Sequence, residues 1–236
     1  MSGQARIGFY GGTFNPIHKG HIAVARAARR SLKLTRVVLI PSAQPPHKSG
    51  MDVASAKHRL AMTRLAASSE SSLVVSDIEH RRKGPSFTAD TVKALKAENP
   101  GADLFFIIGS DSVPNLHTWK RIGELKGNIT FAVASRGARS FDADLANNKA
   151  GAKLVRIQID EPSDISSTRV RSQASSGQGL KDLPDAVANY IREHGLYGVP
   201  ADAVRSESLY SRVVANQPVF ESALDDLACL IGWWYR

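Results

Sequence analysis

Cysteine is nearly absent from this sequence of 236 residues, which contains only Cys229. A single cysteine cannot form an intramolecular disulfide, and there is no cysteine pair to build a zinc ribbon. Long apolar runs are missing as well, because no stretch of about 18 apolar residues occurs and residues 1–6 enter the first apolar segment without a signal-peptide core. We therefore expect neither secretion nor membrane spanning, and a reducing, cytoplasmic setting fits.

Acidic residues are in the minority, since 31 lysines and arginines oppose 22 aspartates and glutamates and give a net charge of +9. This excess predicts an anionic partner, either a nucleic acid or a polyphosphate attracted into a positive cleft. No base-reading module and no basic stripe interleaved with aromatic residues is visible. A basic nucleic-acid-binding domain is therefore the remote alternative, and we predict no nucleic-acid partner.

Short apolar runs recur along the chain, separated by helical stretches of about 10 to 15 residues, the length that a crossover between parallel strands requires. The runs cover residues 7–10, 37–41, 73–76, 104–108, 129–134 and 154–159. Such alternation is typical of a parallel sheet covered on both faces. We predict an α/β fold, a Rossmann-like doubly wound parallel sheet of about six strands with helices on both faces.

The stretch 11–21, GGTFNPIHKGH, lies between the first apolar run and an alanine-rich amphipathic segment, 22–32. This order predicts a strand, a glycine turn and a helix start. Glycines let the backbone approach an anion closely, and a helix N-terminus offers unpaired N–H groups and the positive end of the dipole. His18 and His21 are three residues apart and fall on one face at that end. We interpret the stretch as a phosphate site.

The two histidines have other possible explanations. Zinc binding would need further ligands, and a helical zinc pair is normally four residues apart with a glutamate between. Neither condition is met, so we predict no metal ligands in the protein. The remaining alternative is a glycine turn with two incidental surface histidines.

Ligands of doubly wound sheets bind beyond the carboxyl ends of the strands, and several of these segments carry suitable residues. Lys48 and Arg136 follow the second and fifth runs and could contact phosphate, although a solvated lysine is an equal alternative for Lys48. Gly109 and Asp111 follow the fourth run, where a carboxylate suits ribose hydroxyls but could also cap a helix. Trp119 is either a core residue or a platform for a flat ring.

Residues 166–171, SSTRVR, form a second candidate anion site, with hydroxyl side chains at a helix start and arginines one turn later. An ordinary Ser/Thr helix cap with surface arginines is the alternative.

The segments between these sites have simpler interpretations. Ser55 is the expected N-cap of a helix that ends at Ala67, and His58 and Arg59 on it are interpreted as surface or packing residues. Ser86 or Thr88 is expected to cap a helix over 89–98. The small, polar stretch 138–152 is expected to be a surface excursion.

The two candidate anion sites resemble a known pair of motifs. TFNPIHKGH resembles the (H/T)-x-G-H motif of the nucleotidylyltransferase superfamily, and ISSTRVR at 165–171 resembles its second ATP-binding motif. A histidine at position 18 resembles the nicotinate mononucleotide branch of the superfamily, since the pantetheine-phosphate enzymes usually carry threonine there. Further segments similar to that branch are PPHK at 45–48, SFTADT at 86–91, GSD at 109–111, HTWK at 117–120 and LPDAVANYIREHGLY at 183–197.

The resemblance implies a reaction. ATP and nicotinate mononucleotide would be joined into nicotinate adenine dinucleotide (deamido-NAD) and pyrophosphate in NAD biosynthesis, without a protein nucleophile and with Mg²⁺ carried on the ATP phosphates. An enzyme that prefers nicotinamide mononucleotide and a pantetheine-phosphate adenylyltransferase are the alternatives.

The resemblance also implies site residues. His18, His21 and Arg171 would be catalytic. The ATP contacts would come from Gly11, Gly12, Thr13, Phe14, His18, His21, Gly109, Asp111, Ser167, Thr168 and Arg171.

The mononucleotide would be bound by a separate set of residues. Lys48 and Arg136 would contact its phosphate. Trp119 would stack on the pyridine ring, and the backbone near Thr88 and Trp119 would receive the carboxylate. Lys48 replaces an arginine of the family, which keeps the point charge but not the planar fork that arginine uses for bidentate contacts.

The resemblance covers residues 6–197, so we expect a nucleotidylyltransferase domain over 1–198 and a C-terminal extension over 199–236. Apolar residues over 219–231 follow a helical period, and WWY at 233–235 is apolar. We expect a helical extension that packs on the domain or on a neighbouring subunit of a homo-oligomer.

Overall fold

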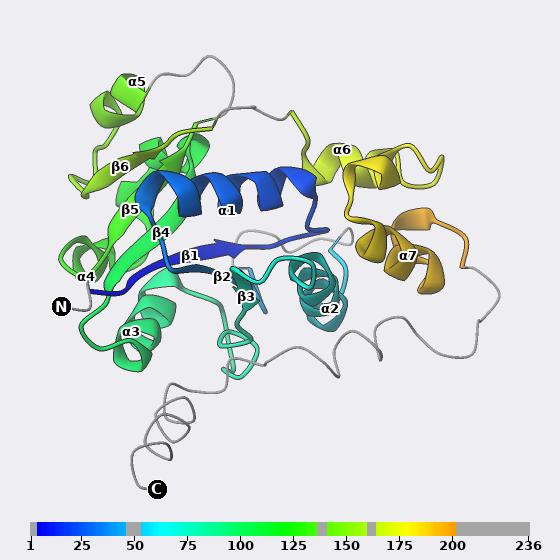
Figure 1. Cartoon of the computed structure of the whole chain (residues 1–236), viewed down its shortest axis with the longest axis horizontal. Helices are drawn as coiled ribbons and strands as arrows, with labels where there is room; N and C mark the ends of the chain where they lie inside the picture. The colour runs from blue at the N-terminus through cyan, green and yellow to red at the C-terminus, as the bar shows by residue number, and fades with distance from the viewer. Residues whose placement is uncertain (1–3, 46–52, 136–140, 160–163, 202–236) are drawn as a thin grey trace, which may run out of the picture.

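The computed structural model describes residues 4–45, 53–135, 141–159 and 164–201. Its centre is a parallel sheet of six strands in the order β3-β2-β1-β4-β5-β6 (Figure 1). The strands are β1 (Arg6–Gly12), β2 (Arg36–Pro41), β3 (Leu73–Val75), β4 (Asp103–Gly109), β5 (Thr130–Ala134) and β6 (Leu154–Ile157). All six predicted strands are confirmed, with ends that differ by at most two residues.

Helices join the strands and cover both faces of the sheet. The α-helices are α1 (Lys19–Leu32), α2 (Ala56–Ala67), α3 (Thr88–Glu98), α4 (Ile122–Lys126), α5 (Phe141–Ala146), α6 (Ser167–Ser172) and α7 (Asp185–Glu193). The 3₁₀ helices are η1 (Ser110–Thr118), η2 (Gly179–Asp182) and η3 (Leu196–Gly198). Figure 1 shows α1 along one face of the sheet and α3 on the opposite face.

The two faces follow from the alternation of side chains along each strand. In β2, Val37 and Leu39 join the core beneath α1, α2 and α7. Val38 and Ile40 point the other way, into the core beneath α3 and α4. A strand buried on both faces must be apolar at every position, which is why it appears in the sequence as an unbroken apolar run. The predicted doubly wound α/β fold is confirmed.

The strand order creates a switch point between β1 and β4. From β1 the chain proceeds outward through β2 to β3, whereas β4 lies on the other side of β1 and leads to β5 and β6. The β1–β4 register pairs Phe9 with Phe106, so its continuation puts Gly12 level with Gly109. Ligands of such sheets bind in the crevice beyond the carboxyl ends of the strands at this point.

Two predicted caps have different outcomes. Ser55 caps α2 as expected, since its Oγ accepts a hydrogen bond from the His58 N–H at 3.3 Å. The predicted cap of α3 is wrong: the N-cap is Phe87, and Thr88 is already the first helical residue. The hydroxyl of Ser86 is used elsewhere, because it accepts a hydrogen bond from the backbone N–H of Gln44 at 3.3 Å.

The described part of the expected surface excursion, residues 141–152, is only partly at the surface. Helix α5 lies there, and its Asp144 is fully buried and accepts a hydrogen bond from the Ser135 hydroxyl at 2.8 Å. Ala150 and Ala152 are buried too. Small residues marked this segment as loop-like, but small residues also permit close packing against a sheet. Across the four described ranges, no helix combines the length and apolar character needed to cross a membrane.

Candidate functional site

The two histidines of the glycine stretch form one unit at the start of α1. His18 is the extended N-cap residue and His21 is the third helical residue. The Nδ1 atom of His21 accepts a hydrogen bond from the His18 backbone N–H at 3.2 Å. Their rings are stacked, with centroids 3.6 Å apart and planes inclined by 27°. Because Nδ1 accepts, we assign the proton of a neutral His21 ring to Nε2, which can donate to an anion.

Burial distinguishes the two rings. His18 is only 1% exposed, whereas His21 is half-buried. The His18 ring occupies space that a side chain at position 20 would need, since a Cβ added to Gly20 would lie 3.1 Å from Nδ1 of His18. The ring of Phe14 packs edge-on against His21, with centroids 5.0 Å apart. The glycine therefore permits the stacked pair, and His21 is the ring that presents an accessible surface.

The second candidate anion segment lies directly against the first. Ser166 caps α6 by accepting from the Arg169 N–H at 3.2 Å. The Ser167 hydroxyl donates to the Pro16 carbonyl at 3.0 Å, and Nη1 of Arg171 donates to the Asn15 carbonyl at 2.9 Å. Figure 1 shows α6 beside the N-terminal end of α1. Two segments that are distant in the sequence thus form one surface.

A pocket of about 470 Å³ opens beside this surface. It is lined by Val53, Ala54, Thr168, Arg171, Ser172, Leu196, Tyr197 and Gly198. Thr168 is exposed and Arg171 is half-buried, so the helix contributes a hydroxyl and a guanidinium to the pocket. Hydroxyl and guanidinium donors are suited to phosphate oxygens.

Gly109 and Asp111 lie at the carboxyl end of β4, across the switch point from the glycine stretch. Asp111 is exposed in the first turn of η1, and the N-cap of that helix is Gly109. Asp111 is therefore not the cap, which was one of its two possible roles. A Cβ added to Gly109 would lie 2.3 Å from Oδ1 of Asp111, so the carboxylate folds back over the glycine. This arrangement leaves an acceptor at the mouth of the crevice.

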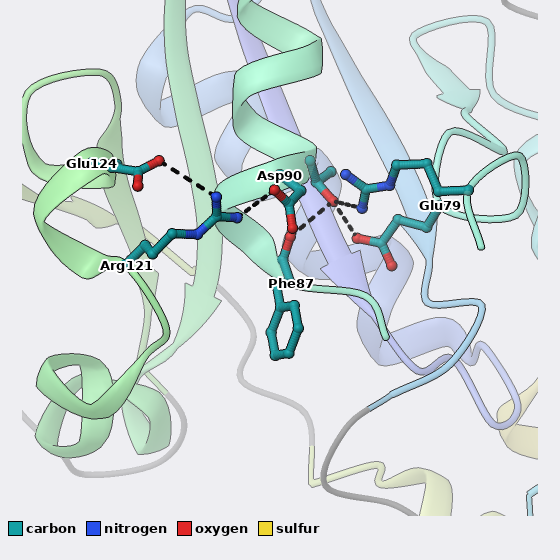
Figure 2. A network of polar contacts seen from close by, with 7 residues as sticks. Glu79, Phe87, Asp90, Arg121 and Glu124 are labelled. Carbon is teal, nitrogen blue, oxygen red and sulfur yellow. Dashed lines mark hydrogen bonds and ion pairs between the residues drawn. The ribbon is translucent and has the colours of Figure 1, made fainter. Parts of the chain in front are cut away.

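The segments that carry Thr88 and Trp119 are held together by their neighbours. Figure 2 shows Asp90, in the first turn of α3, facing Arg121, which follows η1; the two side chains form an ion pair. The hydrogen bond from Arg121 lowers the pKa of the Asp90 carboxyl. Nearby, the Lys120 ammonium lies 4.2 Å from the centroid of the Phe87 ring.

Trp119 is half-buried and contributes to the core as well as to the surface. Its ring is nearly perpendicular to those of Phe106 and Phe131, with centroids 6.3 and 6.1 Å away. Contacts of this kind hold the indole in one orientation, and part of it stays accessible because the residue is only half-buried. Thr88 is also half-buried. Lys48 and Arg136 lie outside the described residues.

Three residues that support the site had no predicted role in it. Asn15 is buried, and its Oδ1 accepts from the Ala54 N–H at 3.0 Å and from the Tyr197 hydroxyl at 2.8 Å. Burial raises the pKa of Tyr197, which therefore remains a donor. Arg59 is buried on α2, so of its two expected roles, surface or packing, the structure shows packing; its helical spacing from the buried Met62 was a usable signal.

The donors gathered here are imidazole, guanidinium, hydroxyl and backbone groups, which favour anions over cations. In the ranges that the structure describes, no group of three or more His, Cys, Asp or Glu side chains could hold a metal ion. The arrangement can therefore bind phosphate oxygens and stabilise negative charge that develops on them.

Comparisons with known proteins agree with this chemistry. The cytidylyltransferase-like family profile matches residues 9–173. A curated relative from Gloeobacter violaceus, named a probable nicotinate-nucleotide adenylyltransferase, is 40% identical over 205 residues, which are 84% of this chain and 98% of the relative. A relative of the same name from Neisseria meningitidis serogroup B is 41% identical over 199 residues, covering 81% of this chain and 98% of its own.

Solved structures show the same fold. The Plasmodium falciparum nicotinic acid mononucleotide adenylyltransferase complexed with NaAD superposes with a TM-score of 0.71 at 21% identity, over 84% of this chain and 100% of its own. The same Plasmodium falciparum enzyme complexed with APC gives a TM-score of 0.69 at 20% identity, over 84% of this chain and 100% of its own. From the curated relatives and the family profile together, the chain belongs to the nicotinate-nucleotide adenylyltransferase family of cytidylyltransferase-like proteins.

Proposed function

We propose that this protein transfers the adenylyl group of ATP to nicotinate mononucleotide, giving nicotinate adenine dinucleotide and pyrophosphate in NAD biosynthesis. The observation that carries the proposal is the meeting of the two anion-binding segments. Ser167 and Arg171 donate to the carbonyls of Pro16 and Asn15 and so form one surface with His18 and His21. The family membership of the chain supports the same reaction.

In this reaction an oxygen of the mononucleotide phosphate attacks the α-phosphorus of ATP. The bond from the α-phosphorus to the oxygen that bridges the α- and β-phosphates breaks, and pyrophosphate leaves with the electron pair. Transfers of this kind depend on alignment and on charge stabilisation rather than on a covalent partner. Donors fixed before the reaction begins are sufficient for this chemistry.

The geometry suggests how the roles are divided. Nε2 of His21 donates to a phosphate oxygen, and the buried His18 ring holds His21 in place from beneath. Thr168 and Arg171 border the pocket of about 470 Å³ and receive the outer phosphates. The carboxylate of Asp111 accepts hydrogen bonds from the ribose hydroxyls.

The mononucleotide binds on the side of the crevice formed by α3 and the end of η1. Trp119, which Phe106 and Phe131 hold at nearly right angles to their own rings, stacks on the pyridine ring, and the backbone near Thr88 receives the nicotinate carboxylate. Lys48 and Arg136 bind the mononucleotide phosphate; both lie outside the described residues, and the sequence motifs support their roles.

We assign Mg²⁺ to the ATP phosphates rather than to a site on the protein. Mg²⁺ retains several waters and commonly binds through substrate phosphates, and the donors at the crevice are suited to anions. When bound, the ion neutralises charge on the phosphates of ATP. His21 and Arg171 would add their own hydrogen bonds to the phosphate oxygens of ATP.

Two further proposals concern the setting of the protein. The single cysteine supports a cytoplasmic location. The apolar period over 219–231 supports a helical extension that packs on the domain or takes part in a homo-oligomer. Removing residues 200–236 should leave the chemistry intact and reduce solubility or change the oligomeric state, which size-exclusion chromatography would detect. A folded truncation without any activity would refute this assignment.

The direct test of function is product identification with three acceptors. We expect ATP and nicotinate mononucleotide to give a dinucleotide and stoichiometric pyrophosphate, with lower rates for nicotinamide mononucleotide and for pantetheine phosphate. A faster reaction with either of the other acceptors would refute the assigned acceptor. Binding to polynucleotide without any nucleotide transfer would instead indicate a nucleic-acid-binding domain.

A further inference from the structure

Arg59 is a buried cation that the chemistry described above does not use. It lies on α2 with only 1% of its surface exposed. Cations are rarely buried to this extent, because removal of the charge from water is costly unless it is fully compensated. Met62 and Thr63, three and four residues later, are also buried, so Arg59 occupies the inward face of the helix.

Hydrogen bonds to four backbone carbonyls compensate the guanidinium. Nε donates to Ala54 at 2.9 Å, Nη1 donates to Thr13 at 2.8 Å and to Ser42 at 2.5 Å, and Nη2 donates to Ala43 at 3.0 Å. A guanidinium has five N–H groups, so these bonds occupy four of them. The acceptors come from the loop after β1, the loop after β2 and the residue before the cap of α2.

The surroundings keep Arg59 charged. Burial lowers the pKa of its guanidinium, and Tyr197 and Glu79 oppose that effect. Arginine stays protonated in proteins at neutral pH, so the side chain remains a cation. Glu79 comes from the loop after β3 and accepts a hydrogen bond from the Thr91 hydroxyl on α3 at 2.7 Å. Figure 2 shows Glu79 directed toward that helix.

We propose that Arg59 is a positioning residue for adenylyl transfer, which holds the loop that contains Thr13 and the loop that contains Ser42 and Ala43 in a fixed relation. This inference rests on the proposed function. The first loop belongs to the ATP-binding stretch, and the second leads along the chain to Lys48, which is assigned to the mononucleotide phosphate. A displacement of one loop by about 1 Å can cost 10²-fold in rate, because the reacting atoms must be aligned.

Lysine cannot reproduce this arrangement. Its ammonium is a single point with three donors, whereas the planar fork of arginine reaches acceptors in several directions at once. Arg59→Lys preserves the charge and most of the apolar stem but cannot serve three chain segments together. We therefore expect each substrate to bind its own loop almost normally while the two loops lose their alignment.

The experiment compares Arg59→Lys with Met62→Ala, which removes apolar volume from the same buried face of α2 and leaves Arg59 in place. For each protein, kcat, the KM for ATP, the KM for nicotinate mononucleotide and the thermal midpoint are measured. We expect Arg59→Lys to lower kcat at least tenfold with each KM changed less than threefold. We expect Met62→Ala to lower the thermal midpoint and to keep kcat per folded molecule within twofold of wild type.

Two results would overturn the proposal. One is a kcat within twofold of wild type in folded Arg59→Lys. The other is an equal loss of kcat in Met62→Ala at the same folded fraction, because Arg59 would then act only through general stability. Should the lysine protein not fold, Arg59→Gln, with an amide that can serve one segment, is judged by the same criteria. An inactive wild-type protein would contradict the proposed function itself and is recognised before any variant is compared.

Discussion

His21 has two roles that a pair of substitutions can separate. Its Nδ1 accepts a hydrogen bond from the His18 N–H at 3.2 Å, which helps to cap α1, and its Nε2 is the assigned donor to ATP. His21→Ala removes both groups. His21→Gln restores an acceptor for the His18 N–H, because Gln at the third helical position is a normal member of a capping box, but it removes the imidazole donor.

The two losses have different sizes and affect different measurements. Loss of a helix cap costs about 0.5–2 kcal/mol of unfolding free energy. A domain with about 5–15 kcal/mol of stability remains almost wholly folded after that loss. Loss of a donor that acts on developing charge costs about 10²- to 10³-fold in kcat, which corresponds to roughly 2.7–4 kcal/mol. The capping effect therefore cannot account for a large fall in turnover.

The assay measures pyrophosphate release at saturating substrates, together with urea unfolding of each protein. We expect His21→Ala to lower kcat at least tenfold, with ATP binding only mildly affected. We expect His21→Gln to recover most of the lost stability and little of the lost turnover. Wild-type turnover in His21→Ala would refute the catalytic role, and wild-type turnover in His21→Gln would show that His21 acts only through the cap.

Three more outcomes follow from the geometry. Gly109→Ala should raise the KM for ATP while adding little to the KM for the mononucleotide, because a Cβ there would lie 2.3 Å from Oδ1 of Asp111 and would displace the carboxylate; unchanged ATP kinetics would argue against a ribose contact. Tyr197→Phe should lower the unfolding free energy by about 0.5–1.5 kcal/mol, as measured in urea, because it removes the hydroxyl that donates to Asn15. Burial, followed by nearby cations, lowers the pKa of His58 below 6.5, so the unfolded chain binds more protons than the folded one just below that pH. The unfolding free energy should therefore be highest above pH 6.5 and fall as the pH drops below that value. His58→Asn should reduce the difference in unfolding free energy between pH 7.5 and pH 5.5, as measured by urea unfolding; an unchanged difference would contradict the assignment.

The sheet was predictable from the sequence because a doubly covered parallel strand needs an apolar side chain at every position. The carboxyl ends of those strands then indicated where polar residues gather. The contacts between segments that are distant in the sequence were harder to predict. The motifs alone do not specify that Ser167 and Arg171 donate to the carbonyls before His18, since that contact depends on how α6 packs beside α1.

Polar residues with structural roles were the least predictable. The sequence gives no direct signal that the Arg59 guanidinium meets four carbonyls, because the acceptors are backbone groups without sequence identity. Ser86 looked like a helix cap, yet its hydroxyl pairs with the loop after β2, a distant partner that competes with the local one. Asp144 likewise becomes buried because Ser135 supplies a donor.

Attack on the α-phosphorus of ATP by nicotinate mononucleotide at the anion-binding crevice is tested most directly by following labelled phosphorus. ATP labelled at the α-phosphorus and ATP labelled at the γ-phosphorus are incubated in parallel with the protein, Mg²⁺ and nicotinate mononucleotide. We expect the α label to appear in the dinucleotide and the γ label to appear only in pyrophosphate. Transfer of the γ label to the acceptor, or no label in any dinucleotide, would contradict it.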